Sequence, residues 1–312
     1  MDVRQVIGSV SELLLTSLAP STMTGYARAW TLLGQCMHHI DIPFHGISSL
    51  PLSSDLMLMF IGYLHLINYA PASIVSYVSA ISYVHKIKNL PDPTSLFVVQ
   101  RLLSAITKTN QTTDPRLPIT LDILTNIITS LQHTDNSHHN QCLLRAMFTV
   151  AFFGLMRIGE ITSDAACQAA VNFNQLSFHE KHAILNISQF KHNSSSQPFQ
   201  IVLPEQKDRV ICPLDALRKY ISLRGNSHGP LFCFQNMHPV SRNYFVNKLN
   251  IALSYCGLSH NSYKSHSFRI GAASYYASTG LSDEQIRLLG RWRSNAFRRY
   301  IRCQRIISAL PE

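Results

Sequence analysis

One short segment of the sequence divides the chain into two parts. Residues 107–118 read TKTNQTTDPRLP, a polar stretch that contains two prolines and no periodic apolar pattern. Such a composition is typical of a linker, because it offers no apolar face that could pack into a core. We therefore expect two domains, a usual number for a chain of 312 residues. We place them at residues 1–110 and 119–312, joined by a linker at 111–118.

Residues 1–110 are predicted to be helical throughout. Apolar side chains recur there at helical spacing; Ile74, Val78 and Ile81, for example, share one face of a segment that begins at Pro71. Proline and serine residues stand where helices are expected to begin, as Pro71 does. Taken alone, this pattern indicates a generic helical bundle.

Residues 119–312 are predicted to combine helices with a small β-hairpin. The apolar pattern changes to period two in AILNISQF, residues 183–190, and again in FQIVL, residues 199–203. The polar segment HNSSSQP joins the two strands, and Lys191 stands at the end of the first. The expected fold class is therefore mainly α with a small hairpin or sheet: an all-helical first domain and an α+β second domain.

The charge of the chain is unevenly distributed. The net charge is +10 and the pI is near 9.4. Residues 1–110 hold six basic and five acidic side chains, so residues 111–312 carry +9 of the +10. An excess of positive charge favours an anionic partner, either nucleic acid or a membrane surface. The most apolar run, residues 56–69, is too short to span a bilayer, so we expect a buried helix there and no membrane partner.

The cysteine and histidine patterns favour neither disulfides nor a metal site. The seven cysteines are scattered, odd in number and without a C-x-x-C pair, which is typical of reduced thiols in the cytosol or nucleus. The adjacent pairs His38–His39 and His138–His139 lack the spacing of metal-binding motifs such as HExxH. These patterns therefore do not favour a metal-dependent enzyme.

Residues 266–302 carry the strongest chemical signal. Seven arginines stand there against two acids. His266 and Arg269 are three residues apart, so they share one face of a helix. A tyrosine hydroxyl, with an ordinary pKa of about 10, needs a base and neighbouring cations before it can act as a nucleophile. Tyr300, next to Arg299, therefore suits a site that binds a phosphodiester and attacks it.

Residues that start and stop helices punctuate this stretch. Ser265 is expected to cap the helix that carries HSFR, and Gly280 to end it. Ser282 is expected to cap a second helix with acids in its first turn, and Gly290 to stop that helix. Tyr300 is predicted to lie on a third, short helix.

The motifs HSFR and GRWRSNAFRRYIR, together with the upstream GLMRIGEIT, resemble the active-site motifs of the tyrosine recombinase (phage-integrase-like) family. The motifs are most similar to those of the eukaryotic mobile-element recombinases of the DIRS, Ngaro and Crypton type. The resemblance covers nearly the whole chain and is strongest over residues 140–302. It implies a helical, SAM-like core-binding domain at the N-terminus, which clasps DNA opposite an α+β catalytic domain.

The resemblance also implies a set of catalytic residues. Arg157 of RIGEI and Arg269 of HSFR would bind the phosphoryl oxygens, and Glu160 would support Arg157. Tyr300 would attack a DNA phosphodiester and form a 3′-phosphotyrosyl link, a mechanism that needs no metal and no cofactor. The remaining members would be Lys191, which protonates the leaving 5′ oxygen, His266, which acts as base or as a donor to the phosphate, and Trp292, which supports the leaving-phosphate side.

One position departs from the family pattern. A His or Trp normally lies nine residues before the nucleophile, but that position is Arg291 here, and Trp292 lies eight residues before Tyr300. We assign the role to Trp292 because of its residue type and its 23-residue distance from Arg269, and we assign a supporting role to Arg291. A one-residue deletion between Trp292 and Tyr300 would reconcile the two counts.

Plainer interpretations exist for several of these residues. Arg157 could be an exposed arginine at a helix end, although its apolar flanks argue against free exposure. Lys191, taken alone, would be a solubilising charge at a turn, and Trp292 a packing residue. The tyrosines that compete with Tyr300 for the role of nucleophile are Tyr263, Tyr275 and Tyr276.

The resemblance implies site-specific DNA breakage and rejoining, for recombination or integration of a mobile element. Double-stranded DNA would be the partner, with four protomers on two duplexes and a monomer or weak oligomer when free. The location would be the nucleus, or the cytoplasm of a prokaryotic host. Type IB topoisomerases nick and reseal DNA through the same adduct, so they are one alternative. A domesticated DNA-binding protein without cleavage activity is another, and a metal-dependent hydrolase is the least favoured.

Overall fold

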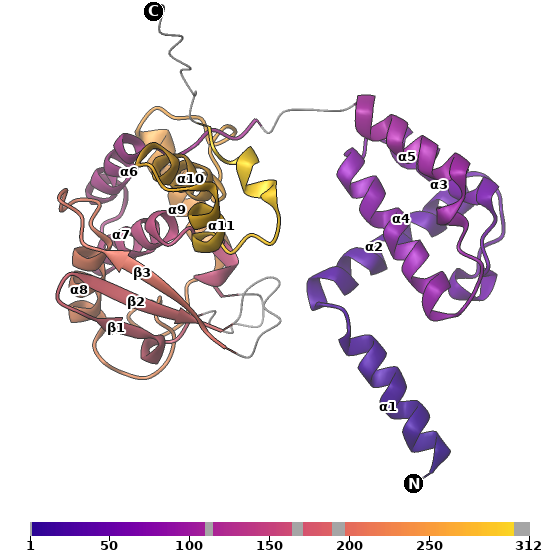
Figure 1. Ribbon diagram of the computed structural model, residues 1–312, viewed down its shortest axis with the longest axis horizontal. Helices are drawn as coiled ribbons and strands as arrows, with labels where there is room; N and C mark the ends of the chain where they lie inside the picture. The colour runs from indigo at the N-terminus through magenta and orange to yellow at the C-terminus, as the bar shows by residue number, and fades with distance from the viewer. Residues whose placement is uncertain (1, 110–114, 164–170, 189–196, 303–312) are drawn as a thin grey trace, which may run out of the picture. The chain divides into compact units, whose positions relative to one another are not determined.

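The chain forms two compact units, Met1–Thr113 and Asp114–Glu312 (Figure 1). The boundary between them falls inside the polar segment 107–118. This computed structural model describes residues 2–109, 115–163, 171–188 and 197–302.

The first unit is built from helices. Their bounds are α1 Val3–Thr16, α2 Pro20–His39, α3 Ser54–Leu66, α4 Pro71–Ile87 and α5 Phe97–Thr109, with 3-10 turns at η1 Gly46–Ser49 and η2 Pro93–Ser95. Helices α2 and α4 begin at prolines, which lack only an N–H that the first helical turn leaves unused. The apolar faces of α2 to α5 meet in one core that includes Leu33, Phe60 and Ile81.

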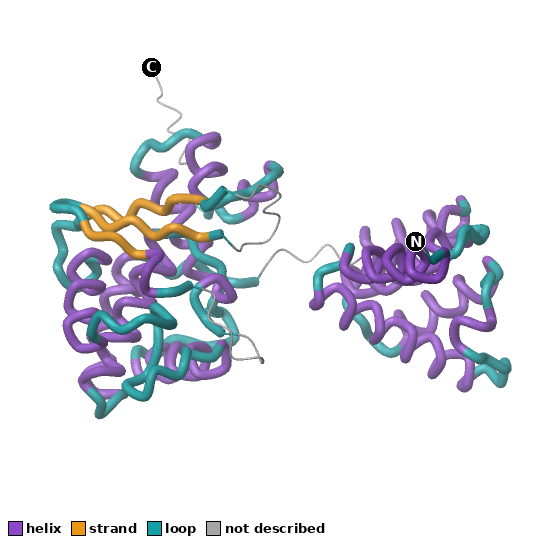
Figure 2. Tube along the Cα trace, turned by 90° about the horizontal axis from the view of Figure 1, so that it is seen from below, coloured by secondary structure: helices purple, strands orange, loops and turns teal. Residues whose placement is uncertain are grey.

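The second unit places a three-stranded antiparallel sheet beside helices. The strands, in the order β1-β2-β3, are β1 Leu176–Phe178, β2 His182–Ile187 and β3 Phe199–Pro204. The helices are α6 Leu121–Thr134, α7 His138–Phe153, α8 Pro213–Arg224, α9 Arg242–Tyr255, α10 Ser267–Ser278 and α11 Asp283–Leu289, with 3-10 turns at η3 Ile158–Glu160, η4 Phe173–Gln175 and η5 Asn295–Arg299. Figure 2 shows the strands as one narrow sheet.

The sheet confirms the predicted hairpin and adds a strand to it. β2 pairs with β3 from His182 opposite Pro204 to Ile187 opposite Phe199. Alternate side chains of β2 are buried, as period two requires. The third strand, β1, was not predicted, because its three residues are too few to show a period. The fold class, mainly helical with a small sheet, is confirmed.

Helix α7 lies at the centre of the second unit and leads into the arginine motif. Twelve of its sixteen residues are buried, and its Phe148 ring contacts Phe245 of α9 and Phe268 of α10, with centroids 5.2 and 5.5 Å apart. The chain leaves α7 at Gly154 and reaches Arg157 three residues later. The buried helix α7 therefore fixes the position from which the chain reaches Arg157.

The helices of residues 266–302 begin and end at the predicted residues in most places. Gly280, with φ of 89°, follows the end of α10, and Ser282 caps α11 by accepting a hydrogen bond from the Gln285 amide at 3.2 Å. Two details differ. His266, not Ser265, is the N-cap of α10, and Tyr300 follows the 3-10 turn η5 instead of lying within a helix.

Among the described residues, no helix is both long and apolar enough to cross a bilayer. The most apolar run of the sequence forms α3, which packs Met57, Phe60 and Ile61 into the core of the first unit, as predicted. The same described residues contain no group of three or more His, Cys, Asp or Glu side chains that could hold a metal ion.

Candidate active site

The structure brings most of the predicted site residues together in the second unit. Arg157 and Glu160 follow α7, His266 and Arg269 begin α10, Arg291 and Trp292 follow α11, and Tyr300 follows η5. Lys191 lies outside the described residues. Segments that are more than a hundred residues apart in the sequence thus meet at one place.

A buried carboxylate ties two of the arginines together. Glu160 is only 4% exposed. Its Oε1 accepts from the Arg157 guanidinium at 3.0 Å, and its Oε2 accepts from the Arg157 backbone amide at 2.8 Å and from the Arg291 Nη2 at 2.7 Å. A buried charge must be paired in this way to be tolerated. The Arg157 side chain keeps 25% of its surface exposed, so its guanidinium is anchored yet still accessible.

Arg291 is an internal residue. Its side chain is 2% exposed, and besides Glu160 it donates to the backbone oxygens of Leu155 at 3.2 Å and Leu289 at 3.2 Å. Burial lowers the pKa of its guanidinium, while the Glu160 carboxylate acts in the opposite direction. Arg291 therefore fits the supporting role that the sequence suggested for it, because its guanidinium is turned inward.

The Arg291 guanidinium also connects this cluster to the hairpin. It lies 5.5 Å from the ring centroid of Phe199, the first residue of β3. The start of β3 is thus packed against the arginine cluster. In the sequence, Lys191 lies in the segment between β2 and β3.

Arg269 is the most buried member of the cluster, at 1% exposure. Its Nη1 donates to the Leu155 carbonyl and its Nη2 donates to the Gly290 carbonyl at 2.8 Å, whereas its Nε has no hydrogen-bond partner among the described residues. Burial, assisted by the nearby Arg157 and Arg291 charges, lowers the pKa of its guanidinium to about 9. Arg269 is therefore still a cation at neutral pH.

Aromatic rings place Tyr300 next to the arginine helix. The Tyr300 ring lies 4.9 Å from the His266 ring and stacks on the Trp292 ring at 5.6 Å, measured between centroids. The Arg269 guanidinium lies 4.3 Å from the centroid of the same indole. Trp292 therefore contacts both the buried cation and the tyrosine, which is the position expected of a residue that organises them.

Gly290 explains why GRW is a tight unit. A Cβ at Gly290 would lie 1.7 Å from a ring atom of Trp292, so the indole rests directly on this glycine's backbone. The next residue, Arg291, has a φ of 57°, in the left-handed region that non-glycine residues rarely adopt. This local turn directs Arg291 into the core and leaves Trp292 facing Tyr300.

No protein-family model matches the sequence, and no curated protein matches it significantly. Several solved structures are similar to this chain. A lambda integrase fragment, crystallised as a dimer bound to a COC′ core site, shares 16% identity over 100% of this chain and 99% of that one, with a TM-score of 0.63. XerH recombinase bound to palindromic difH substrate shares 15% identity over 88% and 75%, with a TM-score of 0.62. The Tn1549 transposon integrase with transposon right end DNA shares 13% over 92% and 90%, at 0.62.

This chain has the lambda integrase fold. The likeness agrees with the predicted fold class and with the fold implied by the sequence motifs. It does not distinguish the DIRS, Ngaro and Crypton types.

Two rival tyrosines have structural roles in this integrase fold. The Tyr276 hydroxyl donates to the Phe153 carbonyl at 2.8 Å, and burial raises its pKa. The Tyr275 ring packs against the rings of Phe152 and Phe153 at the end of α7. Neither contacts His266 or Trp292 through a ring, as Tyr300 does.

Sequence reasoning missed Ser274. This residue of α10 donates from its Oγ to the Tyr300 carbonyl at 3.1 Å and accepts from the Arg302 amide at 2.8 Å. The serine ends a run of small residues after HSFR, from Gly271 to Ser274. The run does pack closely, since a Cβ at Gly271 would lie 1.7 Å from the Ile119 carbonyl oxygen. Its last member also carries a hydroxyl.

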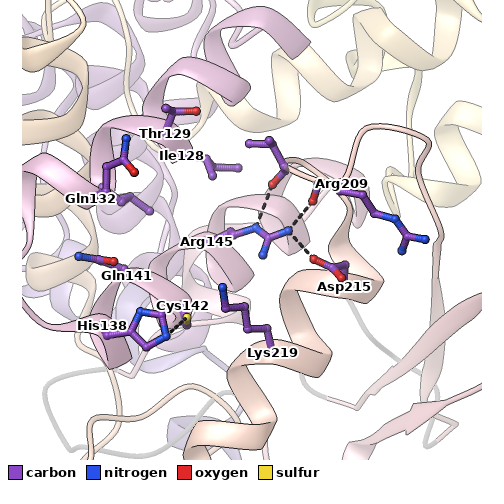
Figure 3. Close-up of a pocket in the computed structure, with 12 residues that line it drawn as sticks. Ile128, Thr129, Gln132, His138, Gln141, Cys142, Arg145, Arg209, Asp215 and Lys219 are labelled. Atoms are coloured by element: carbon purple, nitrogen blue, oxygen red, sulfur yellow. Dashed lines mark hydrogen bonds and ion pairs between the residues drawn. The ribbon is translucent and has the colours of Figure 1, made fainter.

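A separate pocket of about 450 Å³ opens elsewhere on the second unit (Figure 3). None of its lining residues belongs to the predicted site. In it the Arg145 guanidinium donates to the Asp215 carboxylate at 2.7 Å and to the carbonyls of Arg209 and Val210. Arg145 thus fastens the loop before α8 to α7, a role in the architecture of the integrase fold.

Proposed function

We propose that this protein is a tyrosine recombinase that breaks and rejoins DNA through a covalent bond between Tyr300 and a 3′ phosphate. One observation carries the proposal: the Tyr300 ring is held against His266 and Trp292, next to the buried cation Arg269. The fold of DNA-bound integrases and recombinases supports it. The sequence motifs supply the residue roles.

The arginines would supply the electrostatic part of catalysis. Arg157 presents a partly exposed guanidinium whose orientation Glu160 fixes, so it can bind a non-bridging phosphoryl oxygen with little reorganisation. Each Arg269 Nη donates one N–H to a carbonyl and carries a second N–H, and the Nε has no partner among the described residues, so the guanidinium retains donors for a phosphoryl oxygen. Together they would stabilise the pentavalent phosphorus of the transition state.

The bond changes balance without any further reagent. The Tyr300 hydroxyl oxygen bonds to phosphorus while the bond to the 5′ oxygen breaks, and His266 takes the phenolic proton as a general base. Lys191, outside the described residues, would donate a proton to the leaving 5′ oxygen. A 5′ hydroxyl of the same or another strand then reverses these steps and rejoins the DNA.

We further propose that double-stranded DNA is the partner and that four protomers act on two duplexes, with a monomer or weak oligomer when free. A lambda integrase tetramer bound to a Holliday junction, with a TM-score of 0.61 to this chain, supports that assembly. In this proposal residues 1–110 are the core-binding domain, 111–118 the linker and 119–312 the catalytic domain. A eukaryotic mobile element of the DIRS, Ngaro or Crypton type and a nuclear location belong to the same proposal.

Nicked duplexes from the flanks of the gene test the chemistry. Such suicide substrates trap an SDS-resistant protein–DNA adduct, which we expect from the wild type and not from Tyr300→Phe. The matched controls Tyr263→Phe and Tyr275→Phe remove the same hydroxyl from rival tyrosines and should keep the adduct. DNA footprints without any adduct, on substrates that contain the footprinted site, would replace this proposal by a domesticated DNA-binding protein.

A further inference from the structure

Ser274 uses its hydroxyl in an unusual way for a serine within a helix. Serines inside helices ordinarily bond to a carbonyl of the preceding turn. Ser278, one turn further along α10, does so: its Oγ donates to the Tyr275 carbonyl at 2.7 Å. The Ser274 Oγ instead reaches across to the chain after η5, where it meets the Tyr300 carbonyl at 3.1 Å and the Arg302 amide at 2.8 Å.

These two bonds hold the backbone that carries the tyrosine. η5 is a short 3-10 turn, and its last bond runs from the Tyr300 amide to the Phe297 carbonyl at 2.8 Å. Ser274 fixes the next two peptide groups. With the backbone held, the ring retains only its side-chain torsions, and His266 and Trp292 restrict those.

The serine also sets the position of the tyrosine relative to the groups it would work with. His266 caps α10 and Arg269 lies in its first turn, so both share a rigid element with Ser274. A bond from this helix to the Tyr300 carbonyl therefore fixes the hydroxyl relative to the base and the phosphate-binding arginine.

We propose that Ser274 is a positioning residue, which seats the Tyr300 segment on α10 for attack on the phosphodiester. This inference rests on the proposed function, because it assigns a role to Ser274 through the nucleophile. Only a group that both donates and accepts a hydrogen bond can make both contacts. Threonine offers such a group, whereas alanine and valine do not.

The first test needs no DNA. The chain contains two tryptophans, Trp30 and Trp292, and Trp30→Phe leaves Trp292 as the only one. Because the Trp292 indole stacks on Tyr300, its quenching by acrylamide reports whether the tyrosine is seated. In this background we expect Ser274→Ala and Ser274→Val to raise quenching, while Ser274→Thr and the control Ser278→Ala leave it unchanged.

The second test measures adduct formation in a single turnover on nicked duplexes. Loss of hydrogen bonds worth about 1.4 kcal/mol in the transition state corresponds to about a ten-fold slower reaction, which we expect for Ser274→Val with unchanged DNA affinity. Ser274→Thr, nearly identical in shape, should restore the rate, and Ser278→Ala should retain it.

Equal rates for Ser274→Val and the wild type would overturn the inference. So would equal slowing by valine and threonine, because the helix packing and not the hydroxyl would then matter. An inactive wild type would refute the proposed function itself. The quenching series would still decide whether Ser274 seats the tyrosine, and unchanged quenching in Ser274→Val would reject that seat.

Discussion

At the scale of single residues, the site depends on one buried acid among several cations. Burial and neighbouring arginine charges lower the pKa of Arg269 and of Arg291, and the Glu160 carboxylate acts in the opposite direction on both. The carboxylate binds Arg157 and Arg291 directly. Its charge is therefore needed both to orient Arg157 and to make the burial of Arg291 tolerable.

The variant Glu160→Gln tests this dependence. It keeps the shape of the side chain but leaves the Arg291 guanidinium buried without a counter-charge, which should cost about 3 kcal/mol of unfolding free energy. Chemical denaturation measures the loss. Glu284→Gln is the matched control, since Glu284 is 76% exposed and lies 3.9 Å from Arg287, and it should change stability little. Equal stability of the two variants would contradict this account of Glu160.

At the scale of elements, α10 can carry the site only because it approaches the start of the second unit closely. Gly271 packs against the backbone of Ile119, which leaves no room for a Cβ at residue 271. The Ile119 amide donates a hydrogen bond to the Ser267 carbonyl at 3.1 Å. The helix therefore packs backbone to backbone there. Its N-terminal residues, His266 and Arg269, are held where the loop after α7 passes.

Gly271→Ala should disturb this packing. Its Cβ would meet the Ile119 carbonyl oxygen at 1.7 Å, so α10 must move, and the second unit should lose stability by about 1–3 kcal/mol. Gly62→Ala in α3 is the control, because a Cβ there has open space and alanine favours a helix by about 1 kcal/mol. Thermal unfolding of both variants checks the opposite signs. A Gly271→Ala protein as stable as the wild type would show that α10 is not locked at Ile119.

The elements also show how far sequence reasoning reaches. Period two predicted β2 and β3, and the caps Ser282 and Gly280 predicted the ends of the motif helices, because these signals act locally. The start of α7 is a contrasting case, because its first turn after the Ser137 cap is polar and its apolar residues begin only at Cys142. A pattern of apolar residues cannot reveal a polar first turn.

The site itself was predicted as a set of residues but not as a geometry. Residue spacing predicted that His266 and Arg269 share one face of a helix. The burial of Arg291, however, accompanies a left-handed backbone conformation, which no sequence pattern predicted. The role of Ser274 depends on its contact with Tyr300, which lies 26 residues further along the same chain. Such long-range contacts arise from tertiary packing, which local patterns do not encode.

At the scale of the whole molecule, the second unit contains the tyrosine together with the groups it would use. The Tyr300 segment is bound to α10 of its own chain through Ser274, and its ring contacts His266 and Trp292 of that chain. In an assembly of several protomers, each tyrosine would therefore attack the phosphate bound by its own arginines. A neighbouring protomer would not supply the nucleophile.

Mixing two inactive variants tests this arrangement. Tyr300→Phe lacks the proposed nucleophile, and Arg157→Ala lacks the partly exposed arginine that is proposed to bind the phosphate. Attack within one chain requires both residues in the same protomer, so a mixture of the variants on nicked duplexes should form no more adduct than either alone. Adducts restored to about a quarter or more of the wild-type yield would mean that one protomer donates its tyrosine to another. The seat formed by His266, Trp292 and Ser274 would then be a resting position that Tyr300 leaves before it attacks.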